Sequence, residues 1–329
     1  MIRVKGISKT FKVAKRNKGV VSAAKSMFRR EYKYIKAVDN IEFAVNRGEI
    51  VGYIGPNGAG KSTTIKIMSG ILVPDCGECE INGYVPWKNR RQYVSNIGVV
   101  FGQRTQLWWD VPIADSFELL KSIYKIPEVK YKESLGLLTE TLELTDFMDT
   151  PLRQVSLGQR MRAEIAASLL HEPQILFLDE PTIGLDAVSK LAVRKFIKTI
   201  NEQKKITVIL TTHDMNDIEA LTNRVILIGK GRILYDGKMQ EIKRGFDTYR
   251  TVKFIFDENG KETGANIEAE NAECIFQSRE KAVFKIDTSR ATVSEVIAQV
   301  SKQVNILDMT SEGCSTEEVI AGLYKEHGI

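Results

Sequence analysis

Short apolar runs recur along the first two thirds of the chain, and polar or glycine-rich stretches separate them. They occupy residues 49–54, 97–101, 175–180 and 206–212. Continuous apolar runs of four to eight residues are typical of parallel strands that are buried on both faces. Segments at helical spacing alternate with them, so the pattern predicts an α/β core with a buried parallel sheet.

The pattern changes after about residue 237. The expected strands are residues 249–256, 272–276, 282–286 and 305–309, and the expected helices are 293–300 and 316–324. This order suggests a small α+β domain with antiparallel pairing, in which the polar residues 257–271 form an exposed hairpin loop. We therefore expect two domains, residues 1–240 and 241–329.

Composition fits a globular protein with a sizeable core. The chain has 329 residues, of which 43% are hydrophobic and 27% charged. No uncharged apolar stretch approaches the ~18 residues that a membrane span needs, and residues 1–10 lack a signal-peptide core. Four cysteines are too few for a disulfide scaffold, so a reducing cytosolic setting is expected. A membrane role would then be peripheral or through a partner.

The net charge of +5 comes from one segment. Residues 12–36 hold nine basic residues and one acidic residue, a local charge of +8, so the rest of the chain carries −3. Affinity for nucleic acid does not follow from such a distribution, and no nucleic-acid partner is expected.

A phosphate loop follows the first apolar run. Residues 55–62 read Gly-Pro-Asn-Gly-Ala-Gly-Lys-Ser, which matches G-x-x-x-x-G-K-[ST], and a helix is expected over residues 63–69. Backbone N–H groups and the helix N-terminus would surround a phosphate, and Lys61 would add a full positive charge. The Ser62 hydroxyl is then free to hold Mg²⁺.

Two acids end the apolar run at residues 175–180. Asp179 is expected to help bind Mg²⁺, and Glu180, on the opposite side of the pleat, to orient and deprotonate a water molecule. About twenty residues before these acids, Ser156 is expected to cap a helix, and Gly158 to leave the backbone open to an anion. His213 follows the run at residues 206–212 and is expected to reach the γ-phosphate.

Together these residues closely resemble the ATP-binding subunits of ABC transporters, over nearly all of residues 1–240. The resemblance makes Ser62, Gln103 and Asp179 metal-binding, Asp186 the D-loop residue, and Glu180, His213, Gln103 and Lys61 catalytic. The residues that it assigns to ATP binding are Gly55, Pro56, Asn57, Gly58, Ala59, Gly60, Lys61, Ser62, Thr63, Ser156, Gly158, Gln159 and Asp186, together with Phe11 and Tyr32.

The resemblance also implies a fold and an assembly. We expect a P-loop NTPase core of the ABC ATPase type, with an antiparallel β subdomain, a helical subdomain at about residues 104–172, and a small α+β C-terminal domain. Two subunits would face head to tail and bury ATP and Mg²⁺ between one Walker A loop and the other subunit's signature at Ser156 to Gln159. The C-terminal domain resembles that of subunits in drug, sodium and antibiotic export systems.

Several assignments leave two readings open. Gln106 competes with Gln103 for the Q-loop role, and either Phe11 or Tyr32 is expected to stack on adenine. The basic insert at residues 12–36, with a helix expected at 20–34, suits either the anionic inner leaflet or a permease surface, or else covers the nucleotide edge as a solvated flap. Trp108 and Trp109 are expected either to pack on a permease or to be buried in the helical subdomain.

A Cys-x-x-Cys pair, Cys76 and Cys79, is expected in a turn and has no partner ligands at zinc spacing. The sequence thus favours the ATPase subunit of a multi-subunit exporter, a homodimer under separate permease subunits on the cytoplasmic face of the cell membrane. The rival interpretations are a soluble ABC ATPase of translation or DNA repair, and a regulatory module that binds nucleotide without hydrolysing it.

Overall fold

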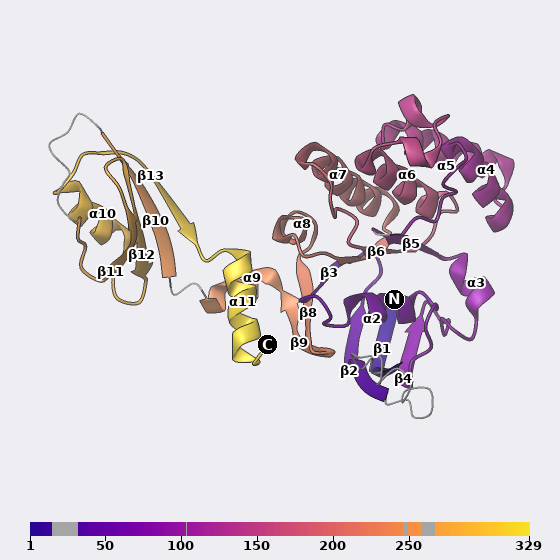
Figure 1. Cartoon of the computed structure of the whole chain (residues 1–329), viewed down its shortest axis with the longest axis horizontal. Helices are drawn as coiled ribbons and strands as arrows, with labels where there is room; N and C mark the ends of the chain where they lie inside the picture. The colour runs from indigo at the N-terminus through magenta and orange to yellow at the C-terminus, as the bar shows by residue number, and fades with distance from the viewer. Residues whose placement is uncertain (15–31, 103, 247–248, 258–266) are drawn as a thin grey trace, which may run out of the picture. The chain divides into compact units, whose positions relative to one another are not determined.

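The computed structural model describes residues 1–14, 32–102, 104–246, 249–257 and 267–329. The chain divides into two compact units, Met1–Gly237 and Lys238–Ile329 (Figure 1). Buried apolar side chains form cores within each unit. Each unit therefore has a hydrophobic core of its own.

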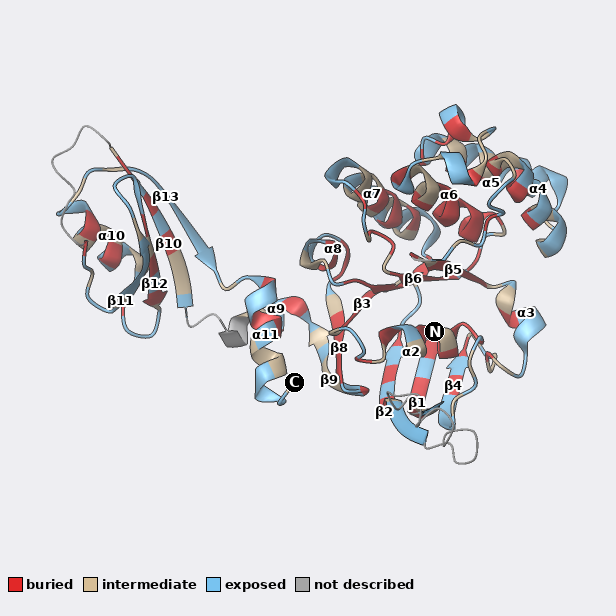
Figure 2. Ribbon diagram, in the orientation of Figure 1, coloured by how far each residue is buried: buried red, intermediate tan, exposed pale blue. Residues whose placement is uncertain are grey.

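A six-stranded sheet forms the centre of the first unit. Its strand order is β5-β6-β7-β3-β8-β9. The strands are β3 (Ile50–Ile54), β5 (Ile97–Phe101), β6 (Ile175–Asp179), β7 (Thr207–Thr211), β8 (Arg224–Gly229) and β9 (Arg232–Lys238). The pairs from β5 to β8 are parallel, and every residue of β6 and β7 is buried. The ribbon at β6 is red, the colour of buried residues, in Figure 2. The four short apolar runs are therefore buried parallel strands, as the sequence predicts.

Helices surround this sheet in the first unit. They are α2 (Lys61–Met68), α3 (Arg90–Val94), α4 (Ile113–Tyr124), α5 (Glu128–Thr141), α6 (Leu157–Leu169), α7 (Ala187–Lys204) and α8 (Met215–Leu221), with short 3₁₀ turns at Thr145–Phe147 and Leu152–Gln154. Helices α4, α5 and α6 pack together, with Phe117, Leu138 and Ile165 in a core that continues to the sheet. They form the helical subdomain that the sequence places at residues 104–172.

A second, antiparallel sheet has the order β2-β1-β4, from β1 (Ile2–Ala14), β2 (Tyr32–Val45) and β4 (Cys76–Ile81). The basic insert enters this sheet. Lys12 pairs with Tyr34 and Ala14 with Tyr32, so the helix expected over residues 20–34 is wrong for residues 32–34, which the ladder holds in extended form. The rest of that expected helix falls on residues 15–31, outside the described residues.

Cys76 and Cys79 lie within β4, where the sequence suggested a turn. Cys79 is buried and pairs with Val4, while Cys76 is exposed and pairs with Ser8. Burial raises the pKa of the Cys79 thiol to about 12. Residues three apart in a strand point to opposite faces, so these two thiols do not face a common metal.

The second unit is a small α+β fold. Its strands are β10 (Tyr249–Phe256), β11 (Ala272–Gln277), β12 (Lys281–Asp287) and β13 (Ile306–Gly313), and its helices are α9 (Met239–Phe246), α10 (Val293–Ser301) and α11 (Thr316–Glu326). The sheet is antiparallel in the order β11-β12-β10-β13. Val252, Phe254 and Phe284 form its core with Val296 and Val300 of α10.

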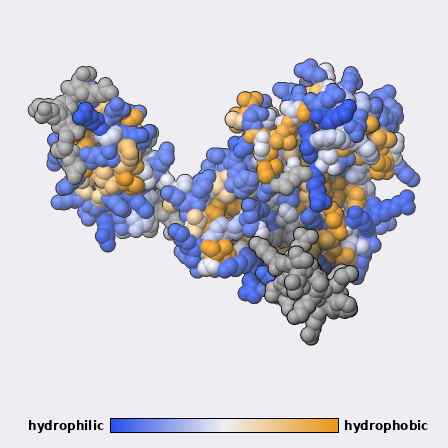
Figure 3. All heavy atoms as spheres, in the orientation of Figure 1, coloured by the Kyte–Doolittle hydropathy of each residue, from blue (hydrophilic) through white to orange (hydrophobic). Residues whose placement is uncertain are grey.

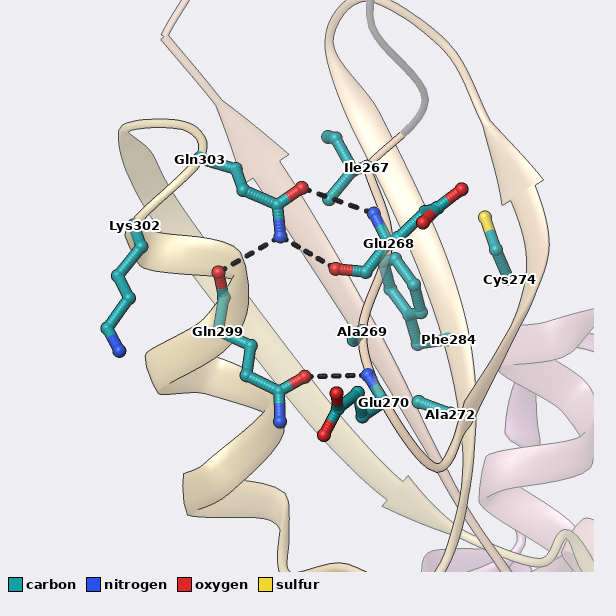
Figure 4. Close-up of a pocket in the computed structure, with 10 residues that line it drawn as sticks. All are labelled: Ile267, Glu268, Ala269, Glu270, Ala272, Cys274, Phe284, Gln299, Lys302 and Gln303. Atoms are coloured by element: carbon teal, nitrogen blue, oxygen red, sulfur yellow. Dashed lines mark hydrogen bonds between the residues drawn. The ribbon is translucent and has the colours of Figure 1, made fainter.

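This strand order contradicts the prediction that residues 257–271 form a hairpin loop. Strand β10 pairs with β12 and β13, so residues 257–271 connect strands that are not neighbours. Ile267 is buried, and two side-chain amides hold the chain beside it. Gln303, just after α10, accepts with its Oε1 from Glu268 N–H at 3.2 Å, and Gln299, within α10, accepts with its Oε1 from Glu270 N–H at 2.7 Å (Figure 4). These residues line a cavity of about 740 Å³.

Among the described residues, no helix is long and apolar enough to cross a membrane. Hydrophilic and hydrophobic residues are mixed over the visible face of both units (Figure 3).

The separate cores generate a prediction. Phe284→Ala removes a fully buried ring from the second unit, so we expect a loss of about 3–5 kcal/mol in the free energy of unfolding of that unit. Differential scanning calorimetry should show one transition moving down while the transition of the first unit stays in place. The control is Leu307→Ala, at a residue that is 62% exposed. Equal shifts of both transitions for Phe284→Ala would contradict independent cores.

Candidate functional site

Glycines let the phosphate loop lie against neighbouring backbone. The loop joins β3 to α2, and Gly60 has φ +112 at the N-terminus of α2. A Cβ on Gly60 would lie 2.3 Å from the Ala37 carbonyl oxygen, and one on Gly55 would lie 2.4 Å from that of Ile228. Both approaches exclude a side chain, so the glycines hold the loop tightly between β2 and β8.

Lys61 is folded back onto this loop. Its Nζ donates to the Gly55 carbonyl at 2.6 Å and to the Pro56 carbonyl at 3.3 Å. Burial lowers the pKa of Lys61 from its ordinary value, while the carboxylates of Glu180 and Asp179 act to raise it. The cation is therefore largely removed from water and lies within the electrostatic field of two acids.

Asp179 joins the phosphate loop to the ends of two strands. Its Oδ1 accepts from Ser62 Oγ at 3.3 Å and from Thr211 Oγ1 at 2.6 Å. Asp179 and Thr211 are opposite one another because β6 and β7 run parallel in register. The structure thus brings Ser62 and Asp179 together, and it adds Thr211, which sequence reasoning missed.

Glu180 does not continue the pleat of β6. It has φ +56, a left-handed conformation that is uncommon for a residue other than glycine. Its N–H donates to the backbone oxygen of Thr211 at 3.0 Å and to Thr211 Oγ1 at 3.1 Å. The expected placement on the opposite side of the pleat is therefore wrong, because the strand ends at Asp179 and Glu180 turns out of it.

His213 follows β7 and faces Glu180, with 3.7 Å between its Nδ1 and Glu180 Oε1. A buried acid fixes the two segments that carry them. Asp217 Oδ2 accepts from Thr182 Oγ1 at 2.5 Å and from Thr212 Oγ1 at 2.9 Å. Since Thr182 follows Glu180 by two residues and Thr212 precedes His213, Asp217 holds both chain segments in place.

The backbone at Gly102, just after β5, lies very close to the backbone of Glu180. A Cβ on Gly102 would lie 2.2 Å from the Glu180 carbonyl oxygen, and its N–H donates to the Asp179 carbonyl at 2.8 Å. Gln103 is outside the described residues. The side-chain amide of Gln106, its competitor, donates to the backbone oxygen of Glu164 at 3.0 Å and so is committed to α6.

The signature residues form a compact cluster with Asp186. Ser156 caps α6 and forms a capping box with Gln159, as expected. Gly158 is buried, however, and a Cβ there would lie 2.4 Å from Ser189 Oγ, so the open backbone expected at Gly158 is wrong. Asp186 caps α7 and accepts from Ser189 N–H at 2.9 Å, so Ser189 lies between the signature and the D-loop position.

A cavity of about 440 Å³ opens beside the phosphate loop. The lining comes from the phosphate loop and the helix after it, from the end of β5 and the residues that follow, and from the two acids at the end of β6. These residues are Asn57, Ser62, Lys66, Ile71, Phe101, Gly102, Arg104, Asp179 and Glu180. Phe11 and Tyr32 are both described by the structure, and neither lines this cavity. The Tyr32 ring instead lies 3.9 Å from Lys12 Nζ, measured to the ring centroid.

Fold and site together define a P-loop ATPase: a glycine-rich loop opening a helix, with a lysine, a serine hydroxyl and two acids at the carboxyl edge of a parallel sheet.

Comparison with known proteins identifies the family. The family described as ABC transporter matches residues 38–183. The chain is 30% identical over 215 residues to the ABC transporter ATP-binding protein NatA of Bacillus subtilis, covering 65% of this chain and 87% of NatA. It is 31% identical over 214 residues to the Nod factor export ATP-binding protein I of Ralstonia nicotianae, covering 65% of this chain and 66% of the relative.

Among solved structures, the dimeric post-hydrolysis state of the ATP-binding cassette MJ0796, bound to ADP and Pi, superposes with a TM-score of 0.60 at 26% identity. The match covers 72% of this chain and 98% of MJ0796. The chain belongs to the ATP-binding proteins of ABC transporters. It is an ATP-hydrolysing subunit of a transporter, rather than a soluble ATPase of translation or repair or a module without hydrolysis.

The tight contact at Gly102 gives a prediction. Gly102→Ala places a methyl group against the Glu180 carbonyl and should displace either segment, so we expect ATP turnover to fall at least about tenfold. Steady-state phosphate release measures this. The control is Gly136→Ala in α5, where an added Cβ meets nothing within 4 Å and removal of a helical glycine should stabilise by about 0.5–1 kcal/mol. Unchanged turnover in Gly102→Ala would contradict the packing described.

Proposed function

We propose that two copies of this chain bind two ATP molecules with Mg²⁺ at a shared interface and that hydrolysis drives export through separate membrane permease subunits. The observation that carries the proposal is the meeting of Lys61, Ser62, Asp179, Glu180 and His213 at one edge of the sheet. Positioning and electrostatic stabilisation of this kind are what phosphoryl transfer requires.

The first step is phosphate binding. Anionic phosphates entering the loop would compete with the Gly55 and Pro56 carbonyls for Lys61, and a charge-assisted bond to phosphate is stronger than one to a neutral carbonyl. Backbone N–H groups of the loop and of the first turn of α2 add further donors.

The donor set beside the loop suits Mg²⁺. The Ser62 hydroxyl and the Asp179 carboxylate are hard oxygen ligands that already meet at 3.3 Å. Gln103 is proposed as a further ligand from the sequence. Bound there, Mg²⁺ would offset the charge of the phosphate oxygens.

Glu180 is proposed as the base and His213 as the group that orients water and contacts the γ-phosphate. The hydrogen bonds from Glu180 N–H to Thr211 fix the backbone of the base, and His213 stands 3.7 Å from its carboxylate. A carboxylate in this position would take the proton of the attacking water as a general base.

The proposed homodimer is head to tail, so each ATP lies between one phosphate loop and the partner's Ser156, Gly158, Gln159 and Asp186. The exposed Ser156 hydroxyl at the N-terminus of α6 is suited to an anion, and MJ0796 is dimeric with ADP and Pi bound. The relevant Gly158 backbone is buried in the single chain, so its contact with the partner's phosphate requires a local shift.

Permease partners and the direction of transport rest on other features. The relative named for Nod factor export supports export, and a permease would place the ATPase on the cytoplasmic face of the cell membrane. Trp108 and Trp109 are exposed, with Arg160 stacked over Trp109 at 5.4 Å, and are proposed to pack on the permease. The basic insert is proposed to approach the anionic inner leaflet.

Two further assignments complete the proposal. The ATPase domain is proposed at residues 1–240 and an accessory domain at 241–329, a boundary three residues beyond the division between the two compact units, which keeps α9 whole in the second. Tyr32 or Phe11 stacks on adenine, since the Ala37 backbone of the same hairpin abuts Gly60 in the phosphate loop.

Glu180→Gln tests the assigned base. The amide keeps the shape of the side chain but does not accept a proton, so turnover should fall roughly 10²- to 10⁴-fold while ATP binding is kept and an ATP-bound dimer accumulates. Phosphate release, nucleotide titration and sedimentation measure the three quantities. The control is Glu202→Gln, an exposed acid on α7. Near-normal hydrolysis by Glu180→Gln would rule out the proposed role.

A further inference from the structure

Residues 101–107 are tied at one end to the strand that carries Asp179. Phe101 pairs with Asp179 in the parallel β5–β6 ladder, and Gly102 N–H donates to the Asp179 carbonyl at 2.8 Å. The Arg104 N–H also donates to the Phe101 carbonyl at 2.9 Å. The near end of this segment is therefore part of the catalytic edge of the sheet.

The far end is tied to α6 through one buried acid. Glu164 is only 2% exposed and accepts from the Thr105 hydroxyl on one carboxylate oxygen and from the Gln106 N–H at 3.2 Å on the other. The Gln106 side chain donates in return to the Glu164 carbonyl at 3.0 Å, and Thr105 Oγ1 accepts from Leu107 N–H at 3.0 Å. Both carboxylate oxygens and the backbone of Glu164 are thus committed to residues 105–106.

Helix α6 runs without interruption from Leu157 to Leu169, and Ser156 caps it with Gln159. Glu164 lies eight residues from Ser156, which is about 12 Å along a helix at 1.5 Å per residue. Gly98 in β5 lets the sheet pack closely against the same helix, because a Cβ there would lie 2.4 Å from the Ser168 carbonyl oxygen. An uninterrupted helix of this length would carry a displacement of residues 105–107 to Ser156.

A buried acid is costly, and an apolar side chain at this place would avoid the cost of removing the carboxyl from water. Burial raises the pKa of Glu164, and the hydrogen bonds from Thr105 and Gln106 lower it in part. The charge of Arg160, one turn earlier on the same helix, also acts to lower the pKa of Glu164. The bonds to Thr105 and Gln106 are therefore the contacts that set the geometry of Glu164.

We propose that Glu164 is a positioning residue that couples the signature end of α6 to the segment after Gln103, so that the two move together when the ATP site closes. Glu164 contacts neither the phosphate loop nor the two acids in the described part of the chain. Its effect should therefore appear in site closure and turnover, and not in the binding of ATP to a single subunit. The inference rests on the proposed function, since it concerns closure of that same site.

The test uses the full-length chain and four variants. Glu164→Gln replaces one acceptor oxygen with a donor, Thr105→Val removes the hydroxyl with little change of shape, and the third variant combines them. The control is Ser168→Ala, a buried hydroxyl on the same helix that donates to its own-helix Ile165 carbonyl at 2.7 Å. The measured quantities are kcat, KM for ATP, the thermal midpoint, and the ATP concentration for half-maximal dimer in the Glu180→Gln background.

We expect Glu164→Gln and Thr105→Val each to lower kcat about tenfold and to leave KM within about twofold. The lost hydrogen bond to the carboxylate should weaken closure of the ATP site without weakening the binding of ATP to a single subunit. The double variant should be no worse than the more impaired single variant, because both remove one link. In the Glu180→Gln background, Glu164→Gln should raise the ATP concentration for half-maximal dimer about tenfold. Ser168→Ala should change kcat by less than about twofold.

Unchanged kcat in Thr105→Val, or losses that multiply in the double variant, would overturn the inference. A lower thermal midpoint with unchanged kcat per folded molecule would assign Glu164 a purely structural role and also overturn it. If Glu164→Gln does not fold, Thr105→Val decides by the same measures. A wild-type chain without ATP turnover would instead contradict the proposed function, so the two failures are distinct.

Discussion

The hydrogen bonds to a single oxygen of Asp179 fix the relation of three chain segments. Ser62 lies in the first turn of α2, Asp179 ends β6, and Thr211 ends β7. This meeting is possible because the strands are parallel and adjacent, so their carboxyl ends lie at the same edge. The same Thr211 holds the Glu180 backbone, so Thr211 fixes the proposed base relative to Asp179, the proposed metal ligand.

Close backbone approaches then make this edge rigid. Gly55, Gly60 and Gly102 each allow a carbonyl oxygen to lie where a Cβ would otherwise stand. Asp217 adds a buried clamp between the segments that carry Glu180 and His213. Preorganised groups of this kind cost no reorganisation when charge develops on the phosphate, which is the main contribution that a protein makes to phosphoryl transfer.

Local sequence was sufficient to predict the phosphate loop, the buried strands, and the positions of Asp179 and His213 at the ends of β6 and β7. Each of these is a short pattern whose chemistry depends on neighbours in the chain, so the residues can be read without knowing the fold. The capping boxes of α6, α10 and α11 are local in the same way.

Contacts between distant residues were not predictable. Thr211 and Glu164 have no motif of their own, and they matter because β7 lies beside β6 and because α6 packs against residues 105–106. The pairing of β10 with β12 depends on strand order, which a series of strand-like runs does not specify. Residues 32–34 fit a helical spacing in the sequence, but they form a strand because they pair with Lys12 to Ala14, and the spacing does not reveal that pairing. The local sequence around Gly158 predicts an open backbone because it does not reveal Ser189, thirty-one residues later, which packs against Gly158.

The central claim is that each ATP site is built from two copies of the chain. Its most direct test mixes a Lys61→Ala subunit, which lacks the phosphate-binding lysine, with a Ser156→Arg subunit, which lacks a usable signature. Each is expected to be inactive alone. In a mixed dimer one site regains an intact loop from one chain and an intact signature from the other, so the account predicts that mixing restores ATP turnover to a substantial fraction of wild type. Two folded variants that remain inactive after mixing, although they form dimers, would contradict it.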